Sequence, residues 1–145
     1  MSRGHSAYQR TQIATADRRK IVVLLYEGAI SRLTQAQHAL KEGDADRRVL
    51  NVNKALDIIH FLNNSLDFEQ GGDISPNLRR LYDYIRDVIS VGNISGDTKK
   101  LDEAGRLLTT LLEAWRTISN GGSGNFAPAL EARTREMIDK VAATG

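Results

Sequence analysis

The chain has 145 residues, of which 41% are hydrophobic and 26% charged, with a formal net charge of +2 and no cysteine. This length suits one domain with a substantial buried core. The lack of cysteine excludes a disulfide framework and thiolate chemistry. No apolar stretch approaches the roughly 20 residues that span a bilayer. We therefore expect a cytoplasmic protein that does not insert into membranes.

Charged side chains of both signs are interleaved at helical spacing, as in Asp83–Arg86 and Glu136–Lys140. This pattern is typical of solvated helix faces. The two basic clusters, Arg18–Lys20 and Arg47–Arg48, lack the interleaved aromatic side chains that bind single strands. The sequence therefore predicts no nucleic-acid partner.

The two ends of the chain differ from its middle. Residues 1–16 show no helical period and predict a mobile N-terminal arm that carries two apolar side chains, Tyr8 and Ile13. Near the C-terminus, residues 121–125 are rich in glycine and serine, which is typical of a flexible linker. Residues 126–145 predict a short amphipathic helix.

The middle of the chain, residues 17–120, predicts four long amphipathic helices. Apolar side chains recur there in steps of three and four, most regularly from Leu101 to Ile118. The helices are expected at about 17–41, 46–69, 76–91 and 98–120, with a turn from Gly92 to Gly96. Long helices joined by short turns pack antiparallel. The predicted fold is an all-α, antiparallel four-helix bundle with a mobile N-terminal arm and a short additional C-terminal helix.

The sequence carries no pattern typical of an active site or a metal centre. None of its three histidines lies three residues after a glutamate, as a di-iron bundle requires. No glycine-rich loop precedes a lysine in the order that binds phosphate. We therefore expect no enzymatic activity, no metal and no cofactor.

His60 supports one alternative function. Histidine phosphotransfer domains are also four-helix bundles, and the stretch His60–Ser65 is similar to their histidine motif. We expect His60 to be exposed, on a polar helix face. However, Asn63 stands in place of the lysine that neutralises phosphate charge, and Asp57, one turn before His60, would repel a phosphate. A solvated histidine is the favoured interpretation, with phosphotransfer as the alternative.

Several apolar side chains lie off the main stripe of their helices, at roughly 70° to 160° from its centre. Either these helices carry wide buried stripes, or part of this surface is exposed and binds a helix of a partner. The candidate binding groove combines these side chains with the arm and with nearby aromatic residues. Its members are Tyr8, Ile13, Val23, Tyr26, Ile30, Ile58, Phe61, Tyr84 and Leu107.

A series of short motifs resembles the flagellin export chaperones (FliS), in order and at the spacing of that family. The motifs are Tyr8-Gln9, Thr11-Gln12, Thr15-Ala16, Leu25-Tyr26-Glu27-Gly28-Ala29-Ile30, Lys54-Ala55, Ile58-Ile59, Leu62, Ser65-Leu66-Asp67, Gly71-Gly72, Asn77-Leu78, Leu81-Tyr82-Asp83-Tyr84 and Glu113-Ala114-Trp115. The resemblance covers about residues 8–118. Two departures are Arg18, where the family usually has proline, and the segment after Asn120, which has no counterpart.

The resemblance implies a cytoplasmic chaperone of flagellar export that consumes no nucleotide. Such proteins bind the C-terminal segment of flagellin, which folds into helices around the chaperone. Binding prevents premature polymerisation, and the complex is presented to a component of the export gate. In the family the N-terminal arm, with its tyrosine, can lie over the client groove, and Tyr8 stands at that motif position.

The C-terminal segment carries five apolar residues that predict one helical stripe, namely Phe126, Leu130, Met137, Ile138 and Val141. An isolated helix of this length is marginal in water, so it is expected to be ordered only where its stripe docks. We expect the segment to occupy part of the apolar groove and to compete with the client. The alternative is that it packs permanently as a fifth structural helix.

Overall fold

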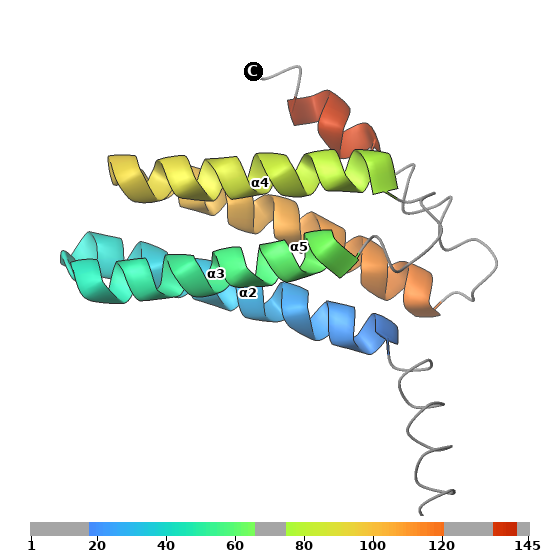
Figure 1. Cartoon of the computed structure of the whole chain (residues 1–145), viewed down its shortest axis with the longest axis horizontal. Helices are drawn as coiled ribbons and strands as arrows, with labels where there is room; N and C mark the ends of the chain where they lie inside the picture. Colours follow the sequence, from blue (N-terminus) through green and yellow to red (C-terminus); the bar gives the residue numbers. More distant parts are fainter. Residues whose placement is uncertain (1–17, 66–74, 121–134, 142–145) are drawn as a thin grey trace, which may run out of the picture.

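A computed structural model of the chain describes residues 18–65, 75–120 and 135–141 (Figure 1). Four long helices make up the first two ranges: α2 (Arg18–Glu42), α3 (Ala45–Ser65), α4 (Ser75–Ser95) and α5 (Thr98–Asn120). A short helix follows at 135–141. The predicted arm, 1–16, and the predicted linker, 121–125, lie outside the described residues.

Each long helix packs against two others: α2 and α4 both contact α3 and α5. Successive helices run in opposite directions, so neighbours in the bundle are antiparallel (Figure 1). The prediction of an all-α four-helix bundle with a short additional C-terminal helix is confirmed. None of the helices in the described ranges has the length and apolar character needed to cross a bilayer.

The reversal between α2 and α3 is made by a glycine followed by a capping aspartate. Gly43 has a φ of 73°, a left-handed conformation that glycine adopts without a Cβ clash. The Asp44 amide donates to the Ala39 carbonyl at 2.9 Å, which closes the C-terminus of α2. The Asp44 carboxylate then accepts a hydrogen bond from the Arg47 amide at 3.1 Å and caps α3. The sequence Gly-Asp therefore ends one helix and starts the next.

The reversal between α4 and α5 repeats this arrangement. Gly96 has a φ of 68°, and the Asp97 amide donates to the Gly92 carbonyl at 3.0 Å. The Asp97 carboxylate accepts a hydrogen bond from the Lys99 amide at 2.9 Å. Asp97 is thus the N-cap of α5.

The predicted turn from Gly92 to Gly96 is wrong in its extent, because α4 continues to Ser95. Gly92 is a buried helical residue. A Cβ at this position would lie 2.8 Å from the Lys100 Cβ and 3.2 Å from the Asp97 carbonyl oxygen. Gly92 therefore lets the end of α4 pass close to the start of α5, and its role is packing and not chain reversal.

Gly92→Ala should lower the free energy of unfolding by roughly 1–3 kcal/mol, because the added methyl group overfills this contact. Gly105→Ala is a matched control in the interior of α5, where an added Cβ would have no atom within 4 Å. This control should raise the free energy of unfolding by about 1 kcal/mol, the difference in helix propensity. Urea denaturation measures both values, and a stabilised Gly92→Ala variant would contradict the packing role.

The core is formed by the apolar stripes that the sequence predicts. Buried side chains of these stripes are Tyr26, Ala29, Leu33, Ala36, Val52, Ile59, Leu62, Leu78, Leu81, Ile85, Val88, Leu101, Ala104, Leu108, Leu111 and Trp115. Val22, Leu40 and Leu56, which continue these stripes in steps of three and four, are only partly buried and pack against the edge of this core. The structure adds Tyr82, Ile89 and Leu112, which lie beside the predicted stripes.

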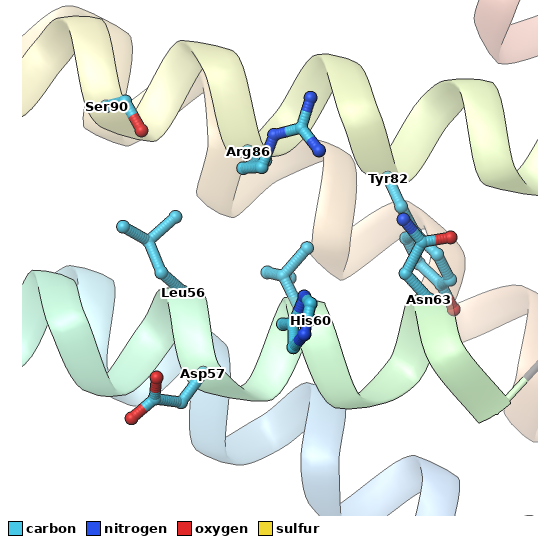
Figure 2. A pocket seen from close by; sticks show the side chains of 8 residues that line it. Leu56, Asp57, His60, Asn63, Tyr82, Arg86 and Ser90 are labelled. Atoms are coloured by element: carbon cyan, nitrogen blue, oxygen red, sulfur yellow. The ribbon is translucent and has the colours of Figure 1, made fainter.

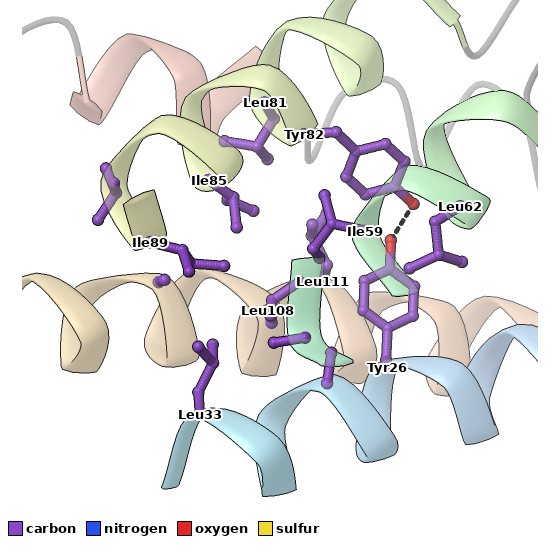
Figure 3. Close-up of a cluster of buried hydrophobic side chains, with 14 of the residues drawn as sticks. Tyr26, Leu33, Ile59, Leu62, Leu81, Tyr82, Ile85, Ile89, Leu108 and Leu111 are labelled. Atoms are coloured by element: carbon purple, nitrogen blue, oxygen red, sulfur yellow. Dashed lines mark hydrogen bonds between the residues drawn. The ribbon is translucent and has the colours of Figure 1, made fainter. Parts of the chain in front are cut away.

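Two tyrosines, Tyr26 and Tyr82, face each other inside the core (Figure 3), and Trp115 lies beside Tyr26. The hydroxyl oxygens of Tyr26 in α2 and Tyr82 in α4 are 2.5 Å apart, and the Trp115 indole in α5 donates to the Tyr26 hydroxyl at 3.1 Å. The rings of Tyr82 and Trp115 lie 6.4 Å and 6.3 Å from the Tyr26 ring, within aromatic contact. Tyr26 therefore links three helices and satisfies two polar groups in an apolar interior.

Tyr26→Phe should destabilise the bundle by roughly 1–3 kcal/mol, because it removes both hydrogen bonds from the buried cluster. Tyr82→Phe should cost less, since the Tyr26 hydroxyl still accepts from Trp115. Urea denaturation of the two variants tests this order. A larger loss for Tyr82→Phe would show that Tyr26 is not the central member.

Candidate functional site

The nine residues of the predicted groove do not form one surface. Tyr8 and Ile13 lie outside the described residues. Tyr26 is fully buried, so it contributes to the core and not to an exposed surface in this structure. The remaining six fall into three pairs, each at a different junction between helices.

The first pair, Ile58 and Phe61, lies on α3 where this helix contacts α2. An added Cβ at Gly28 of α2 would lie 3.5 Å from the Ile58 Cδ1, which places the two helices in close contact here. Phe61, one turn further along α3, has 58% of its surface exposed. Phe61 is therefore the most accessible of the predicted groove residues that the structure describes.

Exposed apolar side chains of α2 extend this region. Ile21, Leu25 and Gly28 follow one another in steps of four and three, so they share a face of α2. Ile21 is 49% exposed, and Leu24, three residues further along α2, is 65% exposed. Because α2 and α3 are antiparallel, the start of α2 lies beside the end of α3 (Figure 1). We call Ile21, Leu24, Leu25, Gly28, Ile58 and Phe61 the α2/α3 surface.

Sequence reasoning missed the α2 part of the α2/α3 surface. The signal is the uninterrupted apolar run from Ile21 to Tyr26. A helix with a single buried stripe cannot bury six consecutive side chains, since they point in directions about 100° apart. Part of such a run has to face solvent, and in this fold the exposed members are Ile21 and Leu24.

The second pair, Val23 and Ile30, lies on α2 at the junction with α5. Both residues share a helix face with Glu27, from which they are separated by steps of four and three. Glu27 forms an ion pair with Arg116 of α5, which fixes the direction of this face. Val23 and Ile30 are half-buried and pack against the core. For Val23 and Ile30, therefore, the first interpretation holds: these side chains widen the buried stripe of α2.

The third pair, Tyr84 and Leu107, lines a hollow between α4 and α5 with a volume of about 660 Å³. Its rim carries charged side chains of both signs, from Lys99, Lys100, Glu103 and Arg106. Tyr84 and Leu107 are half-buried and contact the core cluster. This hollow has an apolar floor and a polar rim, an arrangement typical of a protein-binding surface.

The Tyr84 hydroxyl donates to the Glu103 carboxylate at 2.5 Å. This hydrogen bond, together with desolvation, raises the pKa of Tyr84 from 10.0 to about 12. The folded state therefore holds the Tyr84 proton more tightly than the unfolded state does. Its contribution to stability is fully present below pH 10.0 and is lost as the pH rises towards 12.

Glu103→Gln should lower the pKa of Tyr84 towards 10.0, because it removes the negative charge that disfavours the phenolate. Ultraviolet titration of phenolate absorbance measures this shift. Tyr84→Phe identifies the signal, since it deletes the transition. An unchanged titration curve in Glu103→Gln would show that Glu103 does not hold the Tyr84 proton.

A separate cleft of about 260 Å³ lies between α3 and α4, and His60 is at its edge (Figure 2). His60 is exposed, as predicted, and its Nε2 lies 3.1 Å from the Asn64 Nδ2. Arg86, on the opposite wall, interacts with the carboxylates of Asp83 and Asp87, each at 3.3 Å. Among the described side chains that line the cleft, Arg86 is the one cation, and both contacts pair its guanidinium. This part of the wall therefore offers no unpaired cation to stabilise a phosphoryl group beside His60.

The cleft also contains a buried polar atom without a partner. The Asn63 Nδ2 donates to Asp83 at 3.1 Å, but the Asn63 Oδ1 is buried and accepts no hydrogen bond. In the described ranges no group of three metal-ligating side chains comes together. The exposed apolar side chains of the α2/α3 surface therefore remain the most accessible candidate site.

Comparison with known proteins places the sequence beside flagellar proteins. The family model described as flagellar protein FliS matches residues 1–122. The chain is 37% identical to the flagellar secretion chaperone FliS of Vibrio cholerae over 108 residues, which is 74% of this chain and 79% of the relative. It is 35% identical to the flagellar secretion chaperone FliSB of Pseudomonas aeruginosa over 109 residues, 75% of this chain and 86% of the relative. It is 34% identical to the flagellar secretion chaperone FliS of Salmonella typhimurium over 108 residues, 74% of this chain and 80% of the relative.

Proposed function

Because this chain belongs to the FliS family, we propose that it is a flagellar export chaperone whose client is the C-terminal segment of flagellin. The chaperone holds this segment in helical form in the cytoplasm and prevents premature polymerisation. It then presents the complex to a component of the flagellar export gate. The role is one of binding, and no enzymatic step is assigned to the protein.

The α2/α3 surface is the observation that supports client binding most directly. Three of its large apolar side chains, Ile21, Leu24 and Phe61, are between 49% and 65% exposed. Exposed side chains of this size on adjacent helices form an apolar patch that a partner helix can cover. Gly28 has no side chain, and the Ile58 side chain of α3 lies beside it, which brings the two helices of this surface close together.

The three junctions that hold the predicted groove residues favour a client that contacts more than one side of the bundle. A single straight client helix can reach either the α2/α3 surface or the α4/α5 hollow but not both, because the two lie on opposite pairs of helices. A disordered segment that folds on binding can wrap over several sides. The division of the groove residues therefore agrees with an extended client that forms more than one helix.

Co-purification tests the proposal with full-length flagellin and with flagellin that lacks its C-terminal segment. We expect this protein to retain the first and not the second. Phe61→Glu should weaken binding by about 30-fold, or about 2 kcal/mol, as for a central interface residue. Isothermal titration calorimetry with the isolated flagellin segment measures the affinity.

Ile94→Glu is the matched control, since Ile94 is a large apolar residue that is 85% exposed near the end of α4. It introduces the same charge away from the α2/α3 surface and should leave the affinity unchanged. Retention of flagellin without its C-terminal segment would refute the proposed client site. Equal losses in the two variants would refute the assignment to the α2/α3 surface.

A further inference from the structure

Helix 135–141 lies beyond the residues that match the FliS family, yet it packs on the bundle. Met137 is only 5% exposed and belongs to the same buried cluster as side chains of all four long helices. Ile138 packs against this cluster. The helix lies beside α4, on the side away from α3 (Figures 1 and 2). It therefore covers apolar surface of the part of the chain that the family shares.

Tyr84 and Leu107, the third pair of predicted groove residues, lie at the junction of α4 with α5. Tyr84 points from α4 towards α5, where it reaches Glu103. Tyr84, Leu107 and Ile138 are all partly buried residues that contact the same core cluster. Helix 135–141 therefore lies beside α4, one of the two helices that form the α4/α5 hollow.

Helix 135–141 buries little of its own surface. Met137 is its one buried side chain, and Ile138 and Val141 are half-buried. The other four, Arg135, Glu136, Asp139 and Lys140, are exposed. A helix of two turns does not persist alone in water, so its order depends on docking. A longer amphipathic helix can present more apolar side chains to a groove than Met137, Ile138 and Val141.

We propose that the side of the bundle formed by α4 and α5 is a second docking surface for a client helix, on which helix 135–141 is a displaceable occupant. The client segment binds first or simultaneously at the α2/α3 surface, and a further client helix replaces helix 135–141 beside α4. This proposal rests on the proposed function. Because residues 121–134 tether the helix to α5, its local concentration is high and it lowers the apparent client affinity without blocking it.

Amide hydrogen exchange of the full chain tests displacement directly. The probe is the isolated C-terminal segment of flagellin, added at saturating concentration. We expect exchange in residues 135–141 to become faster when the segment binds, while exchange in α4 and α5 becomes slower. If the segment binds and residues 135–141 stay as protected as before, the second docking surface is refuted and the proposed function stands.

Two variants of the full chain separate displacement from a permanent structural role. Met137→Ser removes the main anchor of the helix and should increase the affinity for the flagellin segment by about tenfold. The free energy of unfolding should fall by no more than the same factor, about 1.4 kcal/mol, because the docked helix stabilises the bundle by the amount by which it opposes the client. Asp139→Ser is the matched control in the same helix, because Asp139 is exposed, and it should change neither quantity.

A lower melting temperature in Met137→Ser without a gain in affinity would overturn the proposal and make the helix a structural fifth element. If the flagellin segment binds the Met137→Ser variant but not the unchanged chain, the result supports the proposal and shows that helix 135–141 blocks the client completely. If the flagellin segment binds none of the three proteins, the proposed function itself is refuted, and the second docking surface falls with it.

Discussion

The cluster of Tyr26, Tyr82 and Trp115 is the constraint on which the rest of the bundle depends. Two hydroxyl groups and an indole N–H are enclosed by apolar side chains, and each is stable there only with a hydrogen-bond partner. The Tyr26 hydroxyl supplies that partner to both neighbours. Burial raises the pKa of Tyr26 and Tyr82 well above the usual value, so both stay neutral in the interior.

This cluster also fixes the rotation of the helices that contribute to it. With Tyr26 turned inward, the residues on the flanks of α2 must face α3 on one side and α5 on the other. Ile21 and Leu24 then lie towards the outside of the bundle, and Val23 and Ile30 lie at the contact with α5. The exposure of Ile21 and Leu24 is therefore a consequence of which side chain on α2 enters the core.

A binding protein of this kind has to keep apolar surface accessible without losing its own fold. In this bundle, different faces of the same helices meet the two requirements. One face of each helix enters the core, and another face carries the accessible side chains. The large apolar side chains that are exposed sit singly or in small groups among charged ones. This distribution limits self-association, while a partner helix with matching apolar positions can still bind.

The sequence by itself determined the helices, most of their ends and the stripes that enter the core. These features depend on neighbours a few residues apart: steps of three and four define a stripe, and Gly43-Asp44 and Gly96-Asp97 define the turns. The family resemblance likewise followed from short motifs in order, and the family match bears it out. His60 was correctly expected to be exposed, because its own helix already shows a polar face there.

Only the tertiary structure decided which side of each helix meets which neighbour. Gly92 has the local signature of a turn, but the start of α5 lies so close to it that any side chain would clash. Val23 and Phe61 both lie off the main stripe of their helices. Val23 is half-buried because α5 packs beside it, whereas Phe61 is exposed. Likewise, Met137 is buried because α4 provides a surface for it. These outcomes depend on distances between segments far apart in the chain, which no local pattern encodes.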